Sequence, residues 1–256
     1  AQANLLLIIS VVIGAPFFIF FGWLSDRVGR KPILMMGLLL ATVLYFPLFK
    51  ALSHYANPQI DAASRQSPIV VMADPSTCTF QFDPVGKARF DSPCDKVKTF
   101  LVKQGLPYTS VSAAPGTPVQ VSVGEQQIQG FDEAAMRAAI SAAGYPAKAD
   151  PSAVNQPMVV LVMVMLTLIA TMTYGPLAAV MVELFPTRIR YTSMSLPYHI
   201  GNGWFGGFLP TVSFALVVYT GDIFYGLWYP VLITGVSLVV GMLCLKETRN
   251  VNIDKV

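Results

Sequence analysis

Five long apolar runs constrain this chain more than any other feature of its sequence. A segment of about 20 mainly apolar residues can cross about 30 Å of hydrocarbon as a helix, because a helix pairs its own backbone amides where no water is available. Hydrophobic residues make up 54% of the chain and charged residues only 12%. The sequence therefore predicts five transmembrane helices, over Leu5–Leu24, Ile33–Leu52, Pro157–Val182, Thr192–Tyr219 and Ile223–Leu245.

A polar insert separates the second run from the third. Eight Lys and Arg and nine Asp and Glu lie within residues 53–156, which is more than half of the charged side chains of the chain. Alternating or apolar patches predict strands at Pro68–Ala73, Cys78–Phe82 and Pro118–Val123, and helical spacing predicts helices at Asp95–Gln104 and Phe131–Ala143. We expect an all-α membrane protein with a small α+β insert, divided into two helices (1–52), the insert (53–156), three helices (157–245) and a tail (246–256).

The basic residues of the short loops predict which side each loop occupies. They follow the first, third and fifth runs, at Arg27, Arg30, Lys31, Arg188, Arg190, Lys246, Arg249 and Lys255. If each run crosses once, all of these residues lie on one side, which is the cytoplasm by the positive-inside rule. The insert then lies outside the cytoplasm.

Cysteine and charge usage narrow the classes of function. Cys78 and Cys94 both lie in the insert, and a disulfide between them would close a loop of about 17 residues and stabilise it by about 3 kcal/mol, although two unpaired thiols are the alternative. The net charge of +3 and the nearly neutral insert argue against nucleic-acid binding. No spacing of His and Cys indicates a metal site, and no glycine-rich phosphate loop indicates a nucleotide cofactor.

The turn between the first two runs, GWLSDRVGRKP at residues 22–32, concentrates charge in a short segment. Gly22 and Gly29 permit close or unusual backbone conformations, and a Pro near the start suits the first turn of the next helix. Asp26 can accept backbone amides at that helix start, while Arg27 and Arg30 can reach helix-end carbonyls or a neighbouring carboxylate.

This turn resembles the conserved loop motif of the major facilitator superfamily. The stretch VELFPTRIRYTSMSL at 182–196 is similar to the segment between helices ten and eleven of sugar porters and metabolite:proton symporters, and KETRNVNI at 246–253 is similar to the tail that follows helix twelve of the symporters. The order of the three stretches fits the carboxy-terminal half, so the five runs would correspond to helices eight to twelve. The amino-terminal half would then be a missing partner, and the resemblance does not cover the insert.

The resemblance implies a gate on the cytoplasmic side. It suggests that Glu183 pairs with Arg27 or Arg30 and that such pairs latch one state of the carrier, whereas the alternative is that each charge is solvated at the interface. The residues expected at this gate are Gly22, Asp26, Arg27, Gly29, Arg30, Lys31, Glu183, Arg188 and Arg190.

Polar residues within the third and fourth runs are candidates for contact with a solute. Polar side chains are costly inside a membrane and usually face a cavity or a partner, and Tyr174-Gly175-Pro176 predicts a break in the third helix. The candidates are Tyr174, Tyr198, His199, Asn202 and Trp204, with helix packing or a structural hydrogen bond as alternatives for the glycines and for His199.

These features together favour a transporter over an enzyme. We expect the chain to be the carboxy-terminal half of a secondary carrier of a bacterial inner membrane, with a periplasmic insert, that moves a small organic solute with protons and uses no cofactor. A sugar-porter-like carrier is the nearest alternative. A membrane sensor or scaffold whose insert binds a ligand is the alternative from another class.

Overall fold

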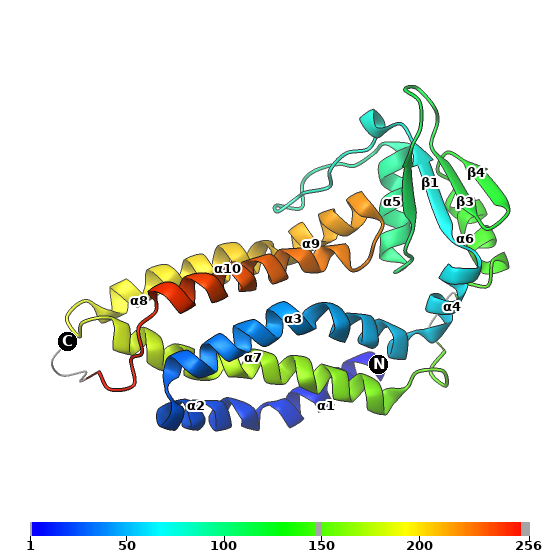
Figure 1. Cartoon of the computed structure of the whole chain (residues 1–256). Coiled ribbons are helices and arrows are strands. Elements are labelled where there is room, and N and C mark those ends of the chain that lie inside the picture. Colours follow the sequence, from blue (N-terminus) through cyan, green and yellow to red (C-terminus); the bar gives the residue numbers. More distant parts are fainter. Residues whose placement is uncertain (1, 147–149, 252–256) are drawn as a thin grey trace. The chain divides into compact units, whose positions relative to one another are not determined.

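The structure of the chain is a computed structural model that describes residues 2–146 and 150–251. Two compact units make up the chain, and each is described separately (Figure 1). The helical unit comprises residues 1–52, 156–209 and 229–256, and the insert unit comprises residues 53–155 and 210–228.

Within the described residues, five helical segments are long and apolar enough to cross a membrane. The first contains α1 (Gln2–Gly14) and α2 (Pro16–Val28), and the second is α3 (Arg30–Ala56). The third is α7 (Gln156–Leu184), and the fourth contains α8 (Arg190–His199), the π-helix η2 (Ile200–Gly206) and α9 (Gly207–Thr220). The fifth contains η3 (Tyr225–Leu227) and α10 (Trp228–Cys244).

Within the helical unit, α7 packs against α1 and α2 along one side (Figure 1). A second contact brings α3, α7 and α10 together through an apolar cluster that includes Leu34, Met35 and Val180. The hydroxyl groups of Thr42 on α3 and Thr234 on α10 are 3.3 Å apart. Large apolar side chains remain exposed along all five segments, as is expected where lipid rather than protein covers a helix.

The break predicted in the third helix at Tyr174-Gly175-Pro176 is wrong. Pro176 lies inside a continuous α7 and is buried. Gly175 has a packing role instead, because a Cβ placed there would lie 3.2 Å from the Gly22 nitrogen and from the Phe18 carbonyl oxygen of α2. The glycine therefore permits α2 and α7 to approach closely.

The insert unit contains a four-stranded sheet in the order β2-β1-β3-β4. Strands β1 and β2 are parallel, whereas β3 is antiparallel to both β1 and β4. The elements are α4 (Pro58–Gln66), β1 (Ile69–Ala73), η1 (Pro75–Thr77), α5 (Pro93–Lys103), β2 (Thr109–Ser112), β3 (Gln120–Val123), β4 (Gln126–Gln129) and α6 (Glu133–Ala142).

One face of this sheet forms the core of the insert. Val71 on β1 lies opposite Val121 on β3, and both side chains are fully buried. Val97 and Leu101 of α5 and Met136 of α6 belong to the same apolar cluster. Both helices therefore cover the same face of the sheet, on which alternate residues of β1 and β3 are buried.

The predicted strands at Pro68–Ala73 and Pro118–Val123 and both predicted insert helices are present, but the predicted strand at Cys78–Phe82 is wrong. The amide of Thr79 donates to the Asp95 carboxylate at 2.8 Å rather than to a neighbouring strand. A disulfide between Cys78 and Cys94 joins this segment to α5. Side-chain contacts with a helix thus replace the pairing that a strand would need.

Candidate functional site

The charged turn connects two helices through a glycine that no other residue replaces without strain. Helix α2 ends at Val28, α3 begins at Arg30, and Gly29 between them has φ +124°. This conformation is costly for residues that carry a Cβ. The first turn of α3 follows this glycine directly, and the Arg30 side chain contacts Glu183 near the end of α7.

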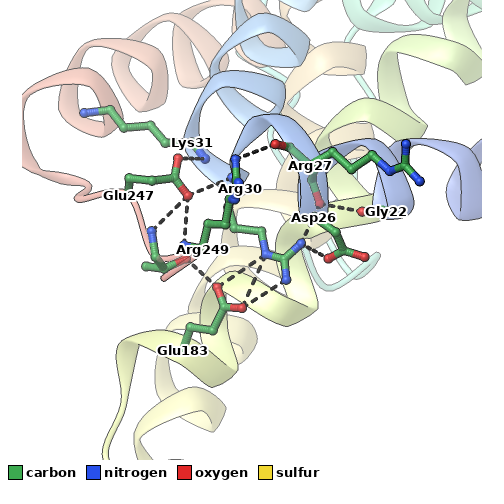
Figure 2. Close-up of polar contacts among 10 residues, drawn as sticks. Gly22, Asp26, Arg27, Arg30, Lys31, Glu183, Glu247 and Arg249 are labelled. Carbon is green, nitrogen blue, oxygen red and sulfur yellow. Dashed lines mark hydrogen bonds and ion pairs between the residues drawn. The ribbon is translucent and has the colours of Figure 1, made fainter. Parts of the chain in front are cut away.

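Arg30 is the centre of a polar cluster that we name the loop–tail network, which consists of Ser25, Asp26, Arg30, Glu183, Glu247, Thr248 and Arg249 (Figure 2). Its Nη2 atom lies 3.1 Å from a carboxylate oxygen of Glu183, and the side chains of Arg30 and Glu183 are only 13% and 8% exposed. The Nη1 atom donates to Ser25 at 3.0 Å and to Asp26. One guanidinium thereby joins the ends of α2, α3 and α7.

The burial of the Arg30–Glu183 pair determines how much free energy is lost when one partner is removed. An exposed ion pair contributes little, whereas removal of one partner of a buried pair leaves an uncompensated charge and costs about 3–5 kcal/mol. The Arg30–Glu183 pair lies close to the buried limit. Its separation therefore requires water to reach both groups at the same time.

Glu247 in the tail completes the network from the opposite end of the sequence. Its carboxylate accepts the backbone amides of Arg30 at 2.8 Å and of Lys31 at 3.1 Å, which belong to the first turn of α3. It also accepts the amides of Thr248 and Arg249, each at 3.0 Å. Glu247 is thus the amino-terminal cap of a helix that begins 217 residues earlier in the chain.

The same hydrogen bonds determine the charge state of Glu247. Desolvation raises the pKa of this carboxyl group, but the amides of Arg249, Arg30, Lys31 and Thr248 together outweigh desolvation and lower the pKa below its usual range. Glu247 is therefore ionised at neutral pH. An ionised group at a helix amino terminus also interacts favourably with the helix dipole.

Two further tail contacts bring the chain end onto the turn. The hydroxyl group of Thr248 donates to Glu183 at 2.5 Å, and Thr248 is buried. The Arg249 guanidinium donates to the carbonyl oxygen of Arg27 (Figure 2). Glu247, Thr248 and Arg249 are not among the residues expected at the gate from the sequence, although an acidic residue close behind the last apolar run is a signal for Glu247.

The remaining residues expected at the gate occupy different positions around the network. The Lys31 ammonium donates to the carbonyl oxygen of Met242 at 2.8 Å. Gly22 contributes its carbonyl oxygen, which accepts the Ser25 hydroxyl at 2.7 Å. The Arg27 guanidinium lies over the Trp23 ring, 4.2 Å from its centre, rather than on Glu183.

The two arginines after the third helix do not join the network. Arg188 is exposed, and it makes no hydrogen bond or ion pair with the residues that the structure describes. Arg190 donates through Nε to the carbonyl oxygen of Phe185 at 3.1 Å, and its buried Nη2 atom has no partner in the described part of the chain. Asp26 also differs from its expected role, because the amides at the start of α3 are bound by Glu247 instead.

A second group of candidates surrounds a cavity of about 410 Å³ in the helical unit. Tyr174, Tyr198 and His199 line it, together with residues of α7 and α8 such as Met181 and Met194. The side-chain Nδ2 of Asn202 donates to the Tyr198 carbonyl oxygen at 3.2 Å, and the Tyr174 hydroxyl is 3.5 Å from Asn202 Oδ1. Trp204 does not line the cavity and is 67% exposed.

The backbone beside this cavity is unusual. Residues Ile200–Gly206 form a π-helix directly after His199, and such segments are rare and often occur at functional sites. A Cβ at Gly201 or Gly203 would meet nothing within 4 Å, so these glycines make no close helix contact with the part of the chain that the structure describes. Residues 196–209 are exposed throughout.

Comparisons with known proteins identify partial similarities to transport proteins. The chain is 37% identical over 65 residues to a citrate-proton symporter of Klebsiella pneumoniae, a match that covers 25% of this chain and 15% of that protein. It is 31% identical over 85 residues to a Haemophilus influenzae protein whose name assigns it, provisionally, to metabolite transport. This match covers 33% of this chain and 19% of that protein. Each match thus covers less than a fifth of the relative.

No protein-family model matches the chain, and no solved structure matches it significantly. The two partial similarities and the five helices long enough to cross a membrane point in the same direction. Together they support a general role in membrane transport.

Proposed function

We propose that the chain is the carboxy-terminal part of a secondary active transporter of the major facilitator type, most similar to metabolite:proton symporters. Its five long helices correspond to helices eight to twelve of such a carrier, and the remaining helices are supplied by the rest of the transporter. The carrier moves a small organic solute, with protons, across a bacterial inner membrane. The relative named as a citrate-proton symporter favours an organic acid as the solute.

The observation that carries this proposal is the loop–tail network. A membrane anchor needs only basic residues in its short loops. Here a buried Arg30–Glu183 pair, with Asp26, Glu247 and Thr248 around it, joins the charged turn, the end of α7 and the tail. The contacts between these three segments connect residues that are 65, 153 and 217 positions apart in sequence. We infer that this network is closed in one state of the carrier and opens in the other, which makes it a latch on the cytoplasmic side.

The insert supports the assignment of sides. Disulfides persist in oxidising compartments such as the periplasm, and Cys78 and Cys94 of the insert are paired. The basic turns that carry Arg30 and Arg188 are then cytoplasmic. The insert and the cytoplasmic latch thus occupy opposite sides of the membrane in this proposal.

The cavity lined by Tyr174, Tyr198 and His199 is the proposed contact with the solute. Its hydroxyl and imidazole groups can donate hydrogen bonds to a carboxylate, and its methionine side chains supply an apolar wall. His199 is also a candidate for proton coupling, because ionisable side chains within membrane-spanning segments usually face a cavity or a partner. The exposed face over residues 196–209 would be covered by helices of the other half of the carrier.

Uptake into proteoliposomes tests the proposal. The full-length gene product that contains this chain is reconstituted, an inward proton gradient is imposed, and uptake of citrate, other organic acids, betaines and sugars is measured. We expect uphill uptake of one organic solute, and loss of most of it in Glu183→Gln but not in Glu125→Gln, a control at the exposed turn between β3 and β4.

Three results would contradict parts of the proposal. Unchanged uptake in Glu183→Gln would remove the latch. Uptake of sugars alone would favour the sugar-porter alternative. If no solute accumulated under any gradient, the transport function itself would be refuted and the sensor or scaffold hypothesis would replace it.

A further inference from the structure

The insert unit contains a cavity of about 850 Å³ that the proposed transport function does not use. Its walls come from α5, from the segment 81–90, from the start of α6 and from residues 210–214 of α9. All of these residues belong to the insert unit. The cavity is therefore separate from the one lined by Tyr174 and Tyr198 in the helical unit.

One wall of the cavity carries positive charge at helical spacing. Lys96, Phe100 and Lys103 follow one another at intervals of four and three residues along α5 and all line the cavity, as expected for residues that share a helix face. Arg137 of α6 adds a third cation. Three cations thus surround a single open space.

The two carboxylates that line the cavity make their hydrogen bonds elsewhere, and neither forms an ion pair with a lysine among the described residues. Asp83 accepts four backbone amides of its own loop, those of residues 85–88. Glu133 accepts both Nε and Nη2 of Arg137, at 3.0 and 2.7 Å. Lys96 has one distant partner, Asp91 at 3.9 Å, and Lys103 has no ion pair within the described residues.

Aromatic rings form the apolar part of the same cavity. Phe90, Phe100, Phe131 and Phe214 line it. Phe100 and Phe131 meet edge to face with ring centres 6.2 Å apart, and the Arg137 guanidinium lies 5.1 Å from the centre of the Phe100 ring. Cations beside aromatic rings provide a surface for a molecule that has one charged end and one apolar end.

The walls are fixed by contacts that do not depend on a ligand. The Cys78–Cys94 disulfide and the Gln81–Thr99 hydrogen bond of 2.7 Å join the segment 78–81 to α5. The Tyr108 amide donates to the Gly221 carbonyl oxygen at 3.0 Å, and the Tyr108 hydroxyl donates to the Val218 carbonyl oxygen at the end of α9. The folded sheet is thereby attached to the helix that supplies Phe214, and preorganised walls reduce the cost of binding.

We propose that this cavity binds an amphipathic anion, in which a carboxylate or phosphate contacts Lys96 and Lys103 and a hydrocarbon or aromatic body packs against the phenylalanine rings. Two sources share this chemistry: a free organic acid and an anionic lipid of the surrounding bilayer. The proposal goes beyond the transport function, because the insert would bind its ligand whether or not the helices carry a solute.

Calorimetry on the whole chain in nanodiscs tests the proposal. In phosphatidylcholine nanodiscs the probe is 4-phenylbutyrate, and its uncharged amide is the matched control for charge. We expect the acid to bind and the amide to bind at least tenfold more weakly. Lys103→Gln should weaken binding of the acid by about tenfold, as expected when a charge-assisted contact is lost, whereas Arg65→Gln, on α4 and outside the cavity, should leave binding unchanged.

A second variant and a second membrane distinguish the apolar contacts and the two sources. Phe90→Ala should weaken binding of phenylbutyrate but not of acetate. In nanodiscs that contain phosphatidylglycerol, loss of the phenylbutyrate binding seen in phosphatidylcholine would identify the lipid as the occupant, whereas unchanged binding would identify a free acid.

Two outcomes would overturn the proposal. One is equal binding of the acid and its amide. The other is no binding of phenylbutyrate in phosphatidylcholine together with equal retention of phosphatidylglycerol by the parent protein and by Lys103→Gln. Because the readout is binding rather than uptake, a carrier that fails to transport would not affect either conclusion.

Discussion

Replacement of Glu247 by alanine tests whether the tail holds the start of α3. The substitution removes the acceptor of the Arg30 and Lys31 amides, at 2.8 and 3.1 Å, and of two amides in the tail itself. Loss of an amino-terminal cap costs about 0.5–2 kcal/mol, and loss of a charge beside a helix dipole costs about 0.3–1 kcal/mol. Because Glu247 is exposed and water can replace part of the loss, we expect a net cost of about 1.5 kcal/mol.

A cost of this size corresponds to about a tenfold change in a local opening equilibrium. Hydrogen exchange followed by mass spectrometry should show about tenfold faster exchange of the Arg30 and Lys31 amides, and trypsin should cleave faster after Lys246 and Arg249. Lowering the pH should act in the same direction. The folded pKa of Glu247 is depressed, so its contribution is complete above the ordinary glutamate pKa and is lost as pH falls through the folded value.

Glu125→Ala is the matched control, because it removes an exposed carboxylate far from α3 in sequence. It should leave exchange at the start of α3 unchanged. If Glu247→Ala also left exchange at Arg30 and Lys31 and cleavage of the tail unaltered, the capping role inferred for Glu247 would be refuted.

Three further perturbations address packing, the disulfide and pH. Gly175→Ala should destabilise the helical unit by about 1–3 kcal/mol through overpacking against Gly22, as measured by thermal unfolding in detergent. Gly201→Ala should not destabilise it, because a Cβ at Gly201 would meet nothing within 4 Å. Equal melting temperatures of the two variants would contradict this packing. Cys94→Ser should lower the free energy of unfolding of the insert by about 3 kcal/mol. Reduction of the parent protein should cause a matching loss. If reductant did not change the stability of the parent protein, a stabilising role of the disulfide would be refuted. Amide hydrogen bonds lower the pKa of Asp74. Exchange of the amides bound to Asp74 should therefore accelerate, relative to the intrinsic exchange rate, only as pH falls below the ordinary aspartate pKa. In Asp74→Asn the ratio of the observed to the intrinsic exchange rate should not change with pH.

The secondary structure was predictable where its cause is local. Apolar runs long enough to span a bilayer gave five helical segments of the expected type, with ends that differ by a few residues. The predicted break at Pro176 did not occur, because the packing of α7 against its neighbours keeps it helical. Strands β2 and β4 escaped prediction because their sequences, TSVS and QQIQ, are polar and depend on pairing with β1 and β3.

The pairing within the charged turn was only partly predictable. The residue types at Asp26, Arg30 and Glu183 indicated a network, but the choice of Arg30 rather than Arg27 follows from the backbone at Gly29 and from the stacking of Arg27 on Trp23. The cap supplied by Glu247 depends on the approach of two segments 217 residues apart.

The sequence alone determined that this chain has five membrane-length helices and one polar insert, because hydrocarbon permits only segments that satisfy their own backbone hydrogen bonds and because insertion therefore depends on local composition. Only the tertiary structure decided which charges meet, which amides Glu247 caps and where the insert forms a cavity. Each of these depends on atoms that are distant in sequence, and a pattern of residue types does not fix the distances between them.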